Sequence, residues 1–233
     1  MERRAFLESC AAMSGAVGFP ALSAWANVPP RMYERTRLVD SAGVPLRARA
    51  LVAQTNYIFH FPYAGTPCFL LNLGRSIDTP ATLRREDGGS YAWQGGAGPS
   101  RAIVAFSAIC AHKLAYPTRD VSFIRYQTQR SATSDAHVIH CCAEHSVYDP
   151  SSGARVVSGP APQPLAAILL EYDAAKDELA AVGTVGAEQF DAFFQKYEFK
   201  LAMEYGQGKA KRPVGATAVV KELAQYCRQT IQC

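Results

Sequence analysis

The sequence has no strong excess of either charge and no apolar run of clear membrane-spanning length. Its formal net charge at pH 7 is +4, and it has no stripe of lysines and arginines with interleaved aromatics, which argues against a nucleic-acid-binding protein. It has no GxGxxG or Walker pattern, so the usual signals for binding dinucleotides and nucleoside triphosphates are missing. No repeat period is visible. With 48% hydrophobic residues, the 233-residue chain has ample sequence for a globular core.

Residues 1–26 have the pattern of an export signal. An arginine pair, Arg3-Arg4, precedes a Phe-Leu step, and a weakly apolar run extends from Cys10 to Ala24. The run ends at an A-x-A cleavage pattern, Ala24-Trp25-Ala26, and the whole stretch resembles a twin-arginine signal. The run is short of the ~20 apolar residues that a full span needs. We therefore predict a periplasmic protein whose signal is either cleaved or retained as an anchor in the inner membrane; the alternative is an ordinary buried N-terminal helix.

Residues 27–185 have the pattern of short strands separated by turns. Runs that alternate or are largely apolar recur at strand length, and each is too short for a typical helix. The clearest runs are residues 44–52, 56–63, 68–73, 101–109, 136–141 and 166–172. Residues 74–100 look like a polar loop. We predict a mainly β domain over 27–185.

Residues 186–233 have apolar side chains at helical spacing. One stripe covers residues 190–205 and a second covers residues 219–231, with a linker rich in Gly, Lys, Arg and Pro between them. We predict a C-terminal extension of two helices that pack on the β domain. The alternative is that part of the aromatic face docks a partner subunit. Cys227 and Cys233 lie close enough in sequence to form a disulfide, although pairings cannot be deduced from sequence.

Residues that bind metals concentrate in two short clusters. The first is Cys110-Ala111-His112, and the second extends from His140 to His145 with the sequence His-Cys-Cys-Ala-Glu-His. Two cysteines and two histidines in the pairs Cys-x-His and Cys-x-x-His predict a site with four ligands, for either zinc or an iron–sulfur cluster. Zinc fingers pair Cys with Cys and His with His, whereas each pair here is mixed.

Residues 100–172 resemble the Rieske iron–sulfur proteins. After the second cluster the chain continues as Ser146-Val147-Tyr148-Asp149, close to the C-P-C-H-G-S-x-Y-D box of that family, and residues 158–165 resemble its proline loop. The resemblance implies an antiparallel β-sandwich in which two hairpin loops bind a Rieske-type [2Fe–2S] cluster. It also implies that the hydroxyls of Ser146 and Tyr148 donate hydrogen bonds to sulfur.

The resemblance implies one cysteine and one histidine ligand from each loop. The predicted set of four is Cys110, His112, Cys142 and His145. With these ligands the second box is one residue short between histidine and tyrosine. An ungapped match would place Cys141 and Glu144 at the ligand positions instead. A carboxylate would be unusual there, so we predict Cys142 and His145, with Cys141 as a rival because adjacent strand residues point to opposite faces.

The resemblance also shows what this chain lacks. Respiratory members of the family have a disulfide beside the cluster, and with the gapped match the two positions are Ala115 and Glu144. Histidine ligands place the family potential at about −150 to +300 mV, and we expect a value in the upper half of that range. A Rieske oxygenase would need a second iron bound by two histidines and a carboxylate. Only His60, His137 and His140 remain for it, and no histidine follows His145, which argues against an oxygenase.

A lone cluster of this type implies one-electron transfer rather than stand-alone catalysis. We predict an exported iron–sulfur subunit of a quinol–cytochrome complex or of a periplasmic oxidoreductase. Its partner would be a cytochrome or a larger oxidoreductase subunit, with quinol as the reductant in the first case. Membrane association would come through the N-terminus. The alternative is a non-redox subunit stabilised by zinc or by disulfides.

Overall fold

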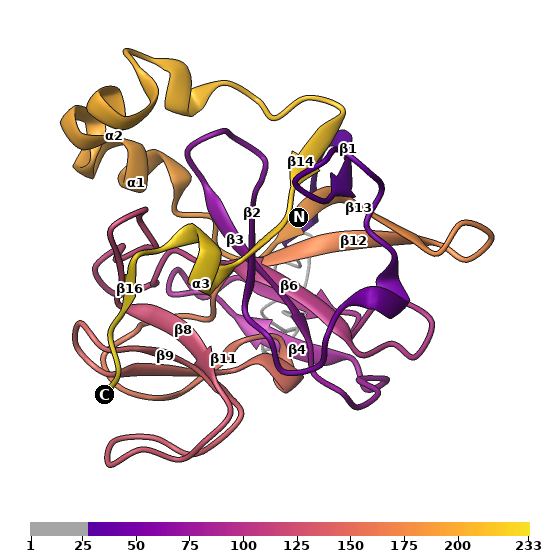
Figure 1. The fold of residues 1–233 in the computed structure, drawn as a ribbon. Coiled ribbons are helices and arrows are strands. Elements are labelled where there is room, and N and C mark those ends of the chain that lie inside the picture. The colour runs from indigo at the N-terminus through magenta and orange to yellow at the C-terminus, as the bar shows by residue number, and fades with distance from the viewer. Residues whose placement is uncertain (1–27) are drawn as a thin grey trace, which may run out of the picture.

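A computed structural model describes residues 28–233, so the predicted signal over residues 1–26 lies outside the described residues. The largest element is an eight-stranded sheet in the order β14-β1-β13-β12-β6-β3-β2-β15 (Figure 1). Neighbouring strands are antiparallel except β1 and β14, which are parallel. The strands are β1 (Arg31–Val39), β2 (Tyr57–His60), β3 (Pro67–Asn72), β6 (Ile103–Ser107), β12 (Ala167–Asp173), β13 (Glu178–Val185), β14 (Thr217–Val219) and β15 (Lys221–Glu222).

A smaller antiparallel sheet has four strands in the order β11-β10-β9-β8. Its strands are β8 (Ile124–Gln127), β9 (Val138–Cys141), β10 (Ser146–Asp149) and β11 (Arg155–Ser158). Two further pairs are β4 (Ala81–Arg84) with β5 (Ser90–Trp93), and β7 (Val121–Ser122) with β16 (Gln229–Thr230). The second of these pairs is parallel and places the C-terminal tail beside the small sheet (Figure 1).

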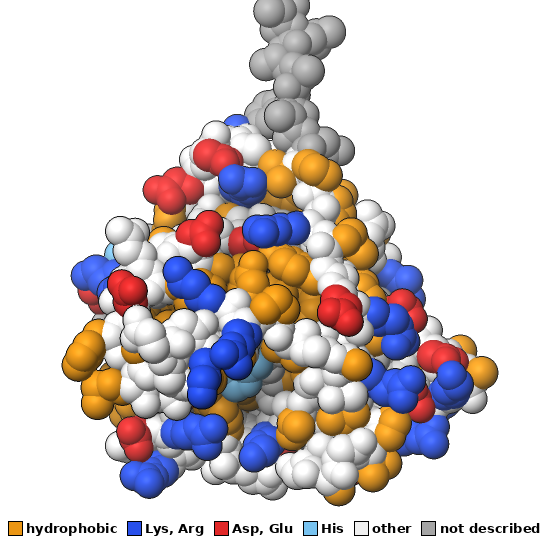
Figure 2. All heavy atoms as spheres, turned by 90° about the horizontal axis from the view of Figure 1, so that it is seen from above, with side chains coloured by type: hydrophobic (Ala, Val, Ile, Leu, Met, Phe, Trp, Pro, Cys, Tyr) orange, Lys and Arg blue, Asp and Glu red, His pale blue; other side chains and the backbone are white. Residues whose placement is uncertain are grey.

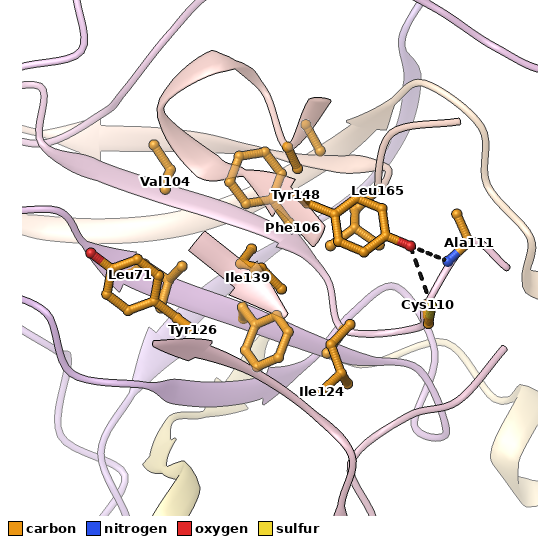
Figure 3. Packing of buried hydrophobic residues seen from close by; sticks show 14 of the residues in the cluster. Leu71, Val104, Phe106, Cys110, Ala111, Ile124, Tyr126, Ile139, Tyr148 and Leu165 are labelled. Carbon is orange, nitrogen blue, oxygen red and sulfur yellow. Dashed lines mark hydrogen bonds between the residues drawn. The ribbon is translucent and has the colours of Figure 1, made fainter. Parts of the chain in front are cut away.

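The main core lies between the two sheets. Leu71, Val104 and Phe106 of the large sheet pack in the same cluster as Ile139 and Tyr148 of the small sheet (Figure 3). The alternate residues of β3 and β6 belong to a second cluster on the other face of the large sheet. Because both faces of β3 and β6 are buried, their sequences are nearly continuous apolar runs. The predicted mainly β fold, with antiparallel sheets packed face to face, is confirmed.

The helices lie mostly in the C-terminal part, and the first predicted helix is present there. It consists of α1 (Phe190–Lys196) and α2 (Glu198–Tyr205), which are separated at Tyr197, and α1 buries Phe190, Phe193 and Phe194. Short 3-10 turns are η1 (Ala48–Ala50), η2 (Pro150–Ser152) and η3 (Lys209–Lys211). No helix among residues 28–233 combines the length and apolar character needed to cross a membrane.

The second predicted helix, over residues 219–231, is not formed. This segment contains β15, the single helical turn α3 (Leu223–Tyr226) and β16, and β14 ends within it. Ala218 and Val220 are buried while Thr217, Val219 and Lys221 are exposed, which is the alternation of a strand. The segment pairs with β1 and with β2, because each of these strands leaves an edge of the large sheet open for pairing.

Acidic and basic side chains both lie on the face shown in Figure 2. On the face shown in Figure 2, basic and acidic side chains alternate around patches of hydrophobic side chains. This distribution fits the small net charge of +4.

Candidate metal centre

Two loops bring a pair of buried cysteines together. The first loop follows β6, and backbone hydrogen bonds close it, from Cys110 N–H to the Ala115 carbonyl (2.8 Å) and from Leu114 N–H to the Cys110 carbonyl (3.0 Å). The second loop is the turn between β9 and β10, where Cys141 pairs with Ser146. The side chains of Cys110 and Cys141 influence each other's pKa, and the two residues are 2% and 1% exposed.

Each of the two thiols has the same backbone surroundings. The N–H groups of His112 and Lys113 point at Cys110 Sγ, and those of Ala143 and Glu144 point at Cys141 Sγ. In both loops these donors are two and three residues after the cysteine. Backbone N–H groups aimed at one point favour an anion there, as in other sulfur and phosphate sites. The two loops are therefore equivalent thiolate-binding turns.

The thiol pair is polarised. The pKa of Cys110 is lowered to about 6 because the Cys141 thiol donates a hydrogen bond to its thiolate, and Tyr148 and the backbone N–H groups add to this effect against the cost of burial. The pKa of Cys141 is raised, first because it donates that hydrogen bond and then because it is buried. One thiolate therefore forms easily, whereas a second would need a positive charge beside it.

Tyr148 connects the small sheet to the first loop. Its hydroxyl lies 3.1 Å from the backbone nitrogen of Ala111 and 3.3 Å from Cys110 Sγ (Figure 3). Since the hydroxyl accepts the Ala111 N–H, its own proton is available to donate to the sulfur. The ring is fully buried, so this donor is held in place by packing.

Ser146 carries a buried hydroxyl that lacks a protein partner. Its Oγ is enclosed without a hydrogen bond to any described residue, and the residue is 1% exposed. A buried hydroxyl without a hydrogen-bond partner lowers the stability of the folded protein by about 1–3 kcal/mol. Such groups therefore usually have an acceptor in the functional state. Ser146 lies opposite Cys141 in the β9–β10 register, next to the thiol pair. The hydroxyl is suited to donate to an acceptor held between the two loops.

His112 and Glu144 form the solvent side of the site. His112 Nδ1 lies 3.5 Å from Glu144 Oε2, and the two side chains are 21% and 41% exposed. The Lys113 ammonium also contacts Glu144, and this hydrogen bond, with the Lys113 charge, lowers the pKa of the carboxyl group. One imidazole and one carboxylate, each from a different loop, therefore lie side by side at the surface.

A third segment packs against the second loop. Residues 158–165 contribute Ala161 and Leu165 to the same apolar cluster as Cys110 and Cys141. Gly159 has a φ of +87°, and a Cβ added to it would lie 2.2 Å from the carbonyl oxygen of His145. Glycine is needed here both for the backbone conformation and for this close approach. The segment lies where the proline loop is expected.

The structure places two of the four predicted ligands, Cys110 and His112, at this site, and it places Cys142 and His145 elsewhere. Cys142 forms a disulfide with Cys233, so its sulfur is not free to act as a thiolate. His145 has a φ of +57°, and its ring turns toward His140, with 3.4 Å between Nδ1 and Nε2.

In the second loop Cys141, rather than Cys142, lies beside Cys110, and Glu144, rather than His145, lies beside His112. Consecutive residues at the end of β9 face opposite ways, and Cys141 is the one that faces the core. The ungapped match to the family box predicted this arrangement. It aligns His145 with the glycine of the box, which agrees with the positive φ at His145. The suggested bridge between Cys227 and Cys233 is also absent, because Cys227 is a free thiol that donates to the Thr118 carbonyl.

No protein-family model matches the chain. Among solved structures, it is similar to the soluble domain of the Rieske protein II (soxF) from Sulfolobus acidocaldarius, with 27% sequence identity and a TM-score of 0.47. The match covers 65% of this chain and 78% of that chain.

Proposed function

We propose that this protein binds a Rieske-type [2Fe–2S] cluster and transfers one electron at a time. One observation carries the proposal, namely two buried thiols from two equivalent loops, each with backbone N–H groups at the second and third following residues. Tyr148 adds a hydroxyl donor toward Cys110, and the buried hydroxyl of Ser146 is free for a further acceptor. These donors fit an anionic sulfur-rich group held between the loops.

The residues that would hold the cluster divide into an inner and an outer pair. Cys110 and Cys141 are the proposed ligands of the inner iron, because their thiols are adjacent and buried. His112 and Glu144 are the proposed ligands of the outer iron, because they lie side by side at the solvent edge. When bound, the cluster supplies reversible one-electron chemistry.

The protein groups around the thiols would set the potential. Backbone N–H groups and the Tyr148 hydroxyl donate to sulfur and so favour the state with one more electron. Glu144 acts in the opposite direction, since a carboxylate is anionic whereas the imidazole of a second histidine is neutral. We therefore infer a potential below that of members with two histidine ligands, rather than the upper-half value that the resemblance alone implies.

The proposed ligands of the outer iron are accessible to a partner. His112 and Glu144 are partly exposed, and beside them lies a surface hollow of about 300 Å³. Its lining includes Lys113, Lys196 and Lys200. We propose that a redox partner with an acidic surface, such as a cytochrome or a larger oxidoreductase subunit, docks here, with quinol as a second candidate reductant. The pattern of residues 1–26 favours a periplasmic location for such a complex.

Electron paramagnetic resonance of the dithionite-reduced full chain tests the cluster. We expect a rhombic signal with an average g value below two, together with two irons per chain. A colourless protein that contains zinc and no iron would instead establish the structural alternative.

A further inference from the structure

A second group of metal-ligand side chains is separate from the proposed cluster ligands. His140 Nε2 lies 3.4 Å from His145 Nδ1, and Cys233 Sγ lies 3.4 Å from Nδ1 and 3.5 Å from Nε2 of His140. The ligand atoms of these three residues all lie within 4.8 Å of one another. Cys142 is bonded to Cys233, which brings a second sulfur to the same place. Two imidazoles and two sulfurs therefore converge where the C-terminal tail meets the β9–β10 turn.

His140 is oriented by neighbours as a metal-binding histidine requires. Its Nδ1 lies 3.3 Å from Gln127 Oε1, and the side-chain nitrogen of Gln127 donates to the carbonyls of Gln129 and Asp135 (both 3.2 Å). Because those carbonyls only accept, the atom of Gln127 that faces His140 is the oxygen, which accepts the Nδ1 proton in one of the two tautomers; Ser134 Oγ, 3.0 Å from Nδ1, can accept the same proton. In that tautomer the lone pair is on Nε2, which faces His145. A hydrogen bond of this kind on the other ring nitrogen is typical of metal-ligating histidines.

Two of the distances between ligand atoms are compatible with a tetrahedral ion. Zinc binds imidazole nitrogen at about 2.0–2.1 Å and thiolate sulfur at about 2.3 Å. An ion at these lengths from His140 Nε2 and His145 Nδ1, which are 3.4 Å apart, would have an N–Zn–N angle of about 110°. The 3.5 Å between His140 Nε2 and Cys233 Sγ gives an N–Zn–S angle of about 107°. Both angles are close to the tetrahedral value, and Cys142 completes a set of four.

We propose that Cys142, Cys233, His140 and His145 form a zinc site that exists only when the disulfide is reduced. A dithiol reductant supplies two electrons and two protons, the sulfur–sulfur bond breaks to give two thiols, and the dithiol becomes a disulfide. Zinc binding then forms two Zn–S bonds and releases the two thiol protons. The disulfide and the zinc site exclude each other, because a bonded sulfur is not a thiolate. In both states the tail stays attached to the β9–β10 turn, next to the proposed cluster ligand Glu144.

The test uses the full chain with Cys110→Ser and Cys141→Ser, so that the proposed cluster site cannot bind the metal. After reduction with a dithiol and its removal under argon, Zn²⁺ affinity is measured by competition with a chromophoric chelator. We expect one tight equivalent in the reduced protein and none in the oxidised protein. Co²⁺ in place of zinc is expected to show the visible bands of a tetrahedral site with thiolate ligands. Native mass spectrometry is expected to show the mass of one zinc less two protons.

Single substitutions identify the ligands. In the same background, His140→Asn and Cys233→Ser are each expected to weaken Zn²⁺ binding by more than about 100-fold, since outer-shell changes alone cost 10–100-fold. The matched controls are His137→Asn, a histidine that contacts Tyr126, and Cys227→Ser, the other C-terminal cysteine; both should bind zinc as before. Cys233 lies in the tail after β16, whereas His140 lies within β9, so substitution of Cys233 tests the site even where His140→Asn perturbs folding.

Two outcomes would overturn this inference. One is a reduced protein that binds no zinc, and the other is zinc binding that neither His140→Asn nor Cys233→Ser weakens. The proposed cluster is measured separately, by paramagnetic resonance of the wild-type chain, so failure of one assignment is distinct from failure of the other.

Discussion

The two adjacent cysteines at the end of β9 differ in chemistry because they face different surroundings. Cys141 meets the Cys110 thiol in the core, and Cys142 meets the C-terminal tail. We expect Cys141→Ser to abolish the cluster, measured as iron content and as the paramagnetic signal of the reduced protein. We expect Cys142→Ser to retain both. Cys233→Ser is the control, since it also removes the disulfide and leaves Cys142 in place. Loss of the cluster in Cys142→Ser alone would show that Cys142 is a ligand.

Glu144 gives the second prediction at this scale. Replacement by histidine exchanges an anionic ligand for a neutral one, so we expect Glu144→His to raise the reduction potential. In the family, two histidines in place of two cysteines raise the potential by several hundred millivolts, so one such exchange is worth on the order of 100 mV or more. A redox titration measures the shift.

His145→Ala is the control for this measurement, because the His145 ring turns to His140 rather than to the thiol pair. Its cluster is expected to form with an unchanged ligand signature. If His145→Ala loses the cluster while Glu144→Ala keeps it, the ligand is His145.

The two loops differ in how far the sequence alone determines which residues face the site. Cys110 and His112 belong to a short motif with one reasonable alignment, and they lie together at the site. In the second loop the alignment depends on which cysteine faces the core. That choice is made by the packing of β9 against the large sheet, which a motif does not contain. A motif also does not reveal that the backbone at His145 has a positive φ.

At the scale of elements, prediction succeeds where local pattern and packing agree. The apolar runs of β3 and β6 are buried strands as expected, and residues 190–205 are helical. Residues 44–52 contain the 3-10 turn η1 (Ala48–Ala50) and none of the named strands, and the loop predicted over 74–100 contains the β4–β5 hairpin. The apolar residues over 219–231 fit the period of a helix and also that of a strand, so their spacing alone predicts a helix. Pairing with the edges of the large sheet favours the strand instead.

The C-terminal tail is an element held by two kinds of contact. Backbone hydrogen bonds connect Arg228 to Arg119 and Ile231 to Ser122 (both 2.9 Å), and the disulfide joins Cys233 to Cys142 across 91 residues of sequence. A disulfide that closes so long a loop raises the free energy of unfolding by about 2–4 kcal/mol, chiefly because it restricts the unfolded chain. We expect Cys233→Ser to lower the free energy of unfolding by this amount, measured by urea denaturation under oxidising conditions.

Reduction provides the matched control for this prediction. In the presence of a dithiol and a metal chelator, wild type and Cys233→Ser are expected to unfold at the same urea concentration, because neither then has the bridge. Equal stability under oxidising conditions would contradict the prediction.

At the scale of the whole molecule, His60 connects the large sheet to the C-terminal segments. Its Nε2 lies 3.4 Å from the hydroxyls of Tyr205 and Tyr226, and burial, with the nearby charge of Arg119, lowers its pKa to about 4. The native state therefore holds His60 neutral, while the unfolded chain binds a proton below about pH 6.5. Neutral His60 therefore contributes fully to the free energy of unfolding above pH 6.5, and this contribution is lost as the pH falls from 6.5 toward 4.

The expected size of this effect is up to about 3 kcal/mol between pH 7 and pH 4, from a shift of about 2.5 pKa units. Urea denaturation at several pH values measures it. His60→Asn should show a smaller loss of stability on acidification than wild type, whereas His137→Asn should follow the wild type. Parallel curves for His60→Asn and wild type would exclude His60 as the cause.

The proposed outer ligands lie beside a basic hollow whose lysines come from several elements. A partner would therefore contact the helices as well as the loops. Lys196 and Lys200 come from α1 and α2, whereas Lys113 comes from the first loop, so the helices complete a surface that the loops begin. Attraction between this surface and an acidic partner would steer association and weaken with salt.

For an acidic redox partner we expect Lys200→Glu to lower the rate of association roughly tenfold at low ionic strength and to flatten its dependence on salt. Lys176→Glu is the control, because Lys176 lies on the β12–β13 turn, which extends away from the small sheet (Figure 1). Stopped-flow oxidation of the reduced protein measures both variants, and equal effects of the two substitutions would mean that net charge, rather than this hollow, controls the encounter.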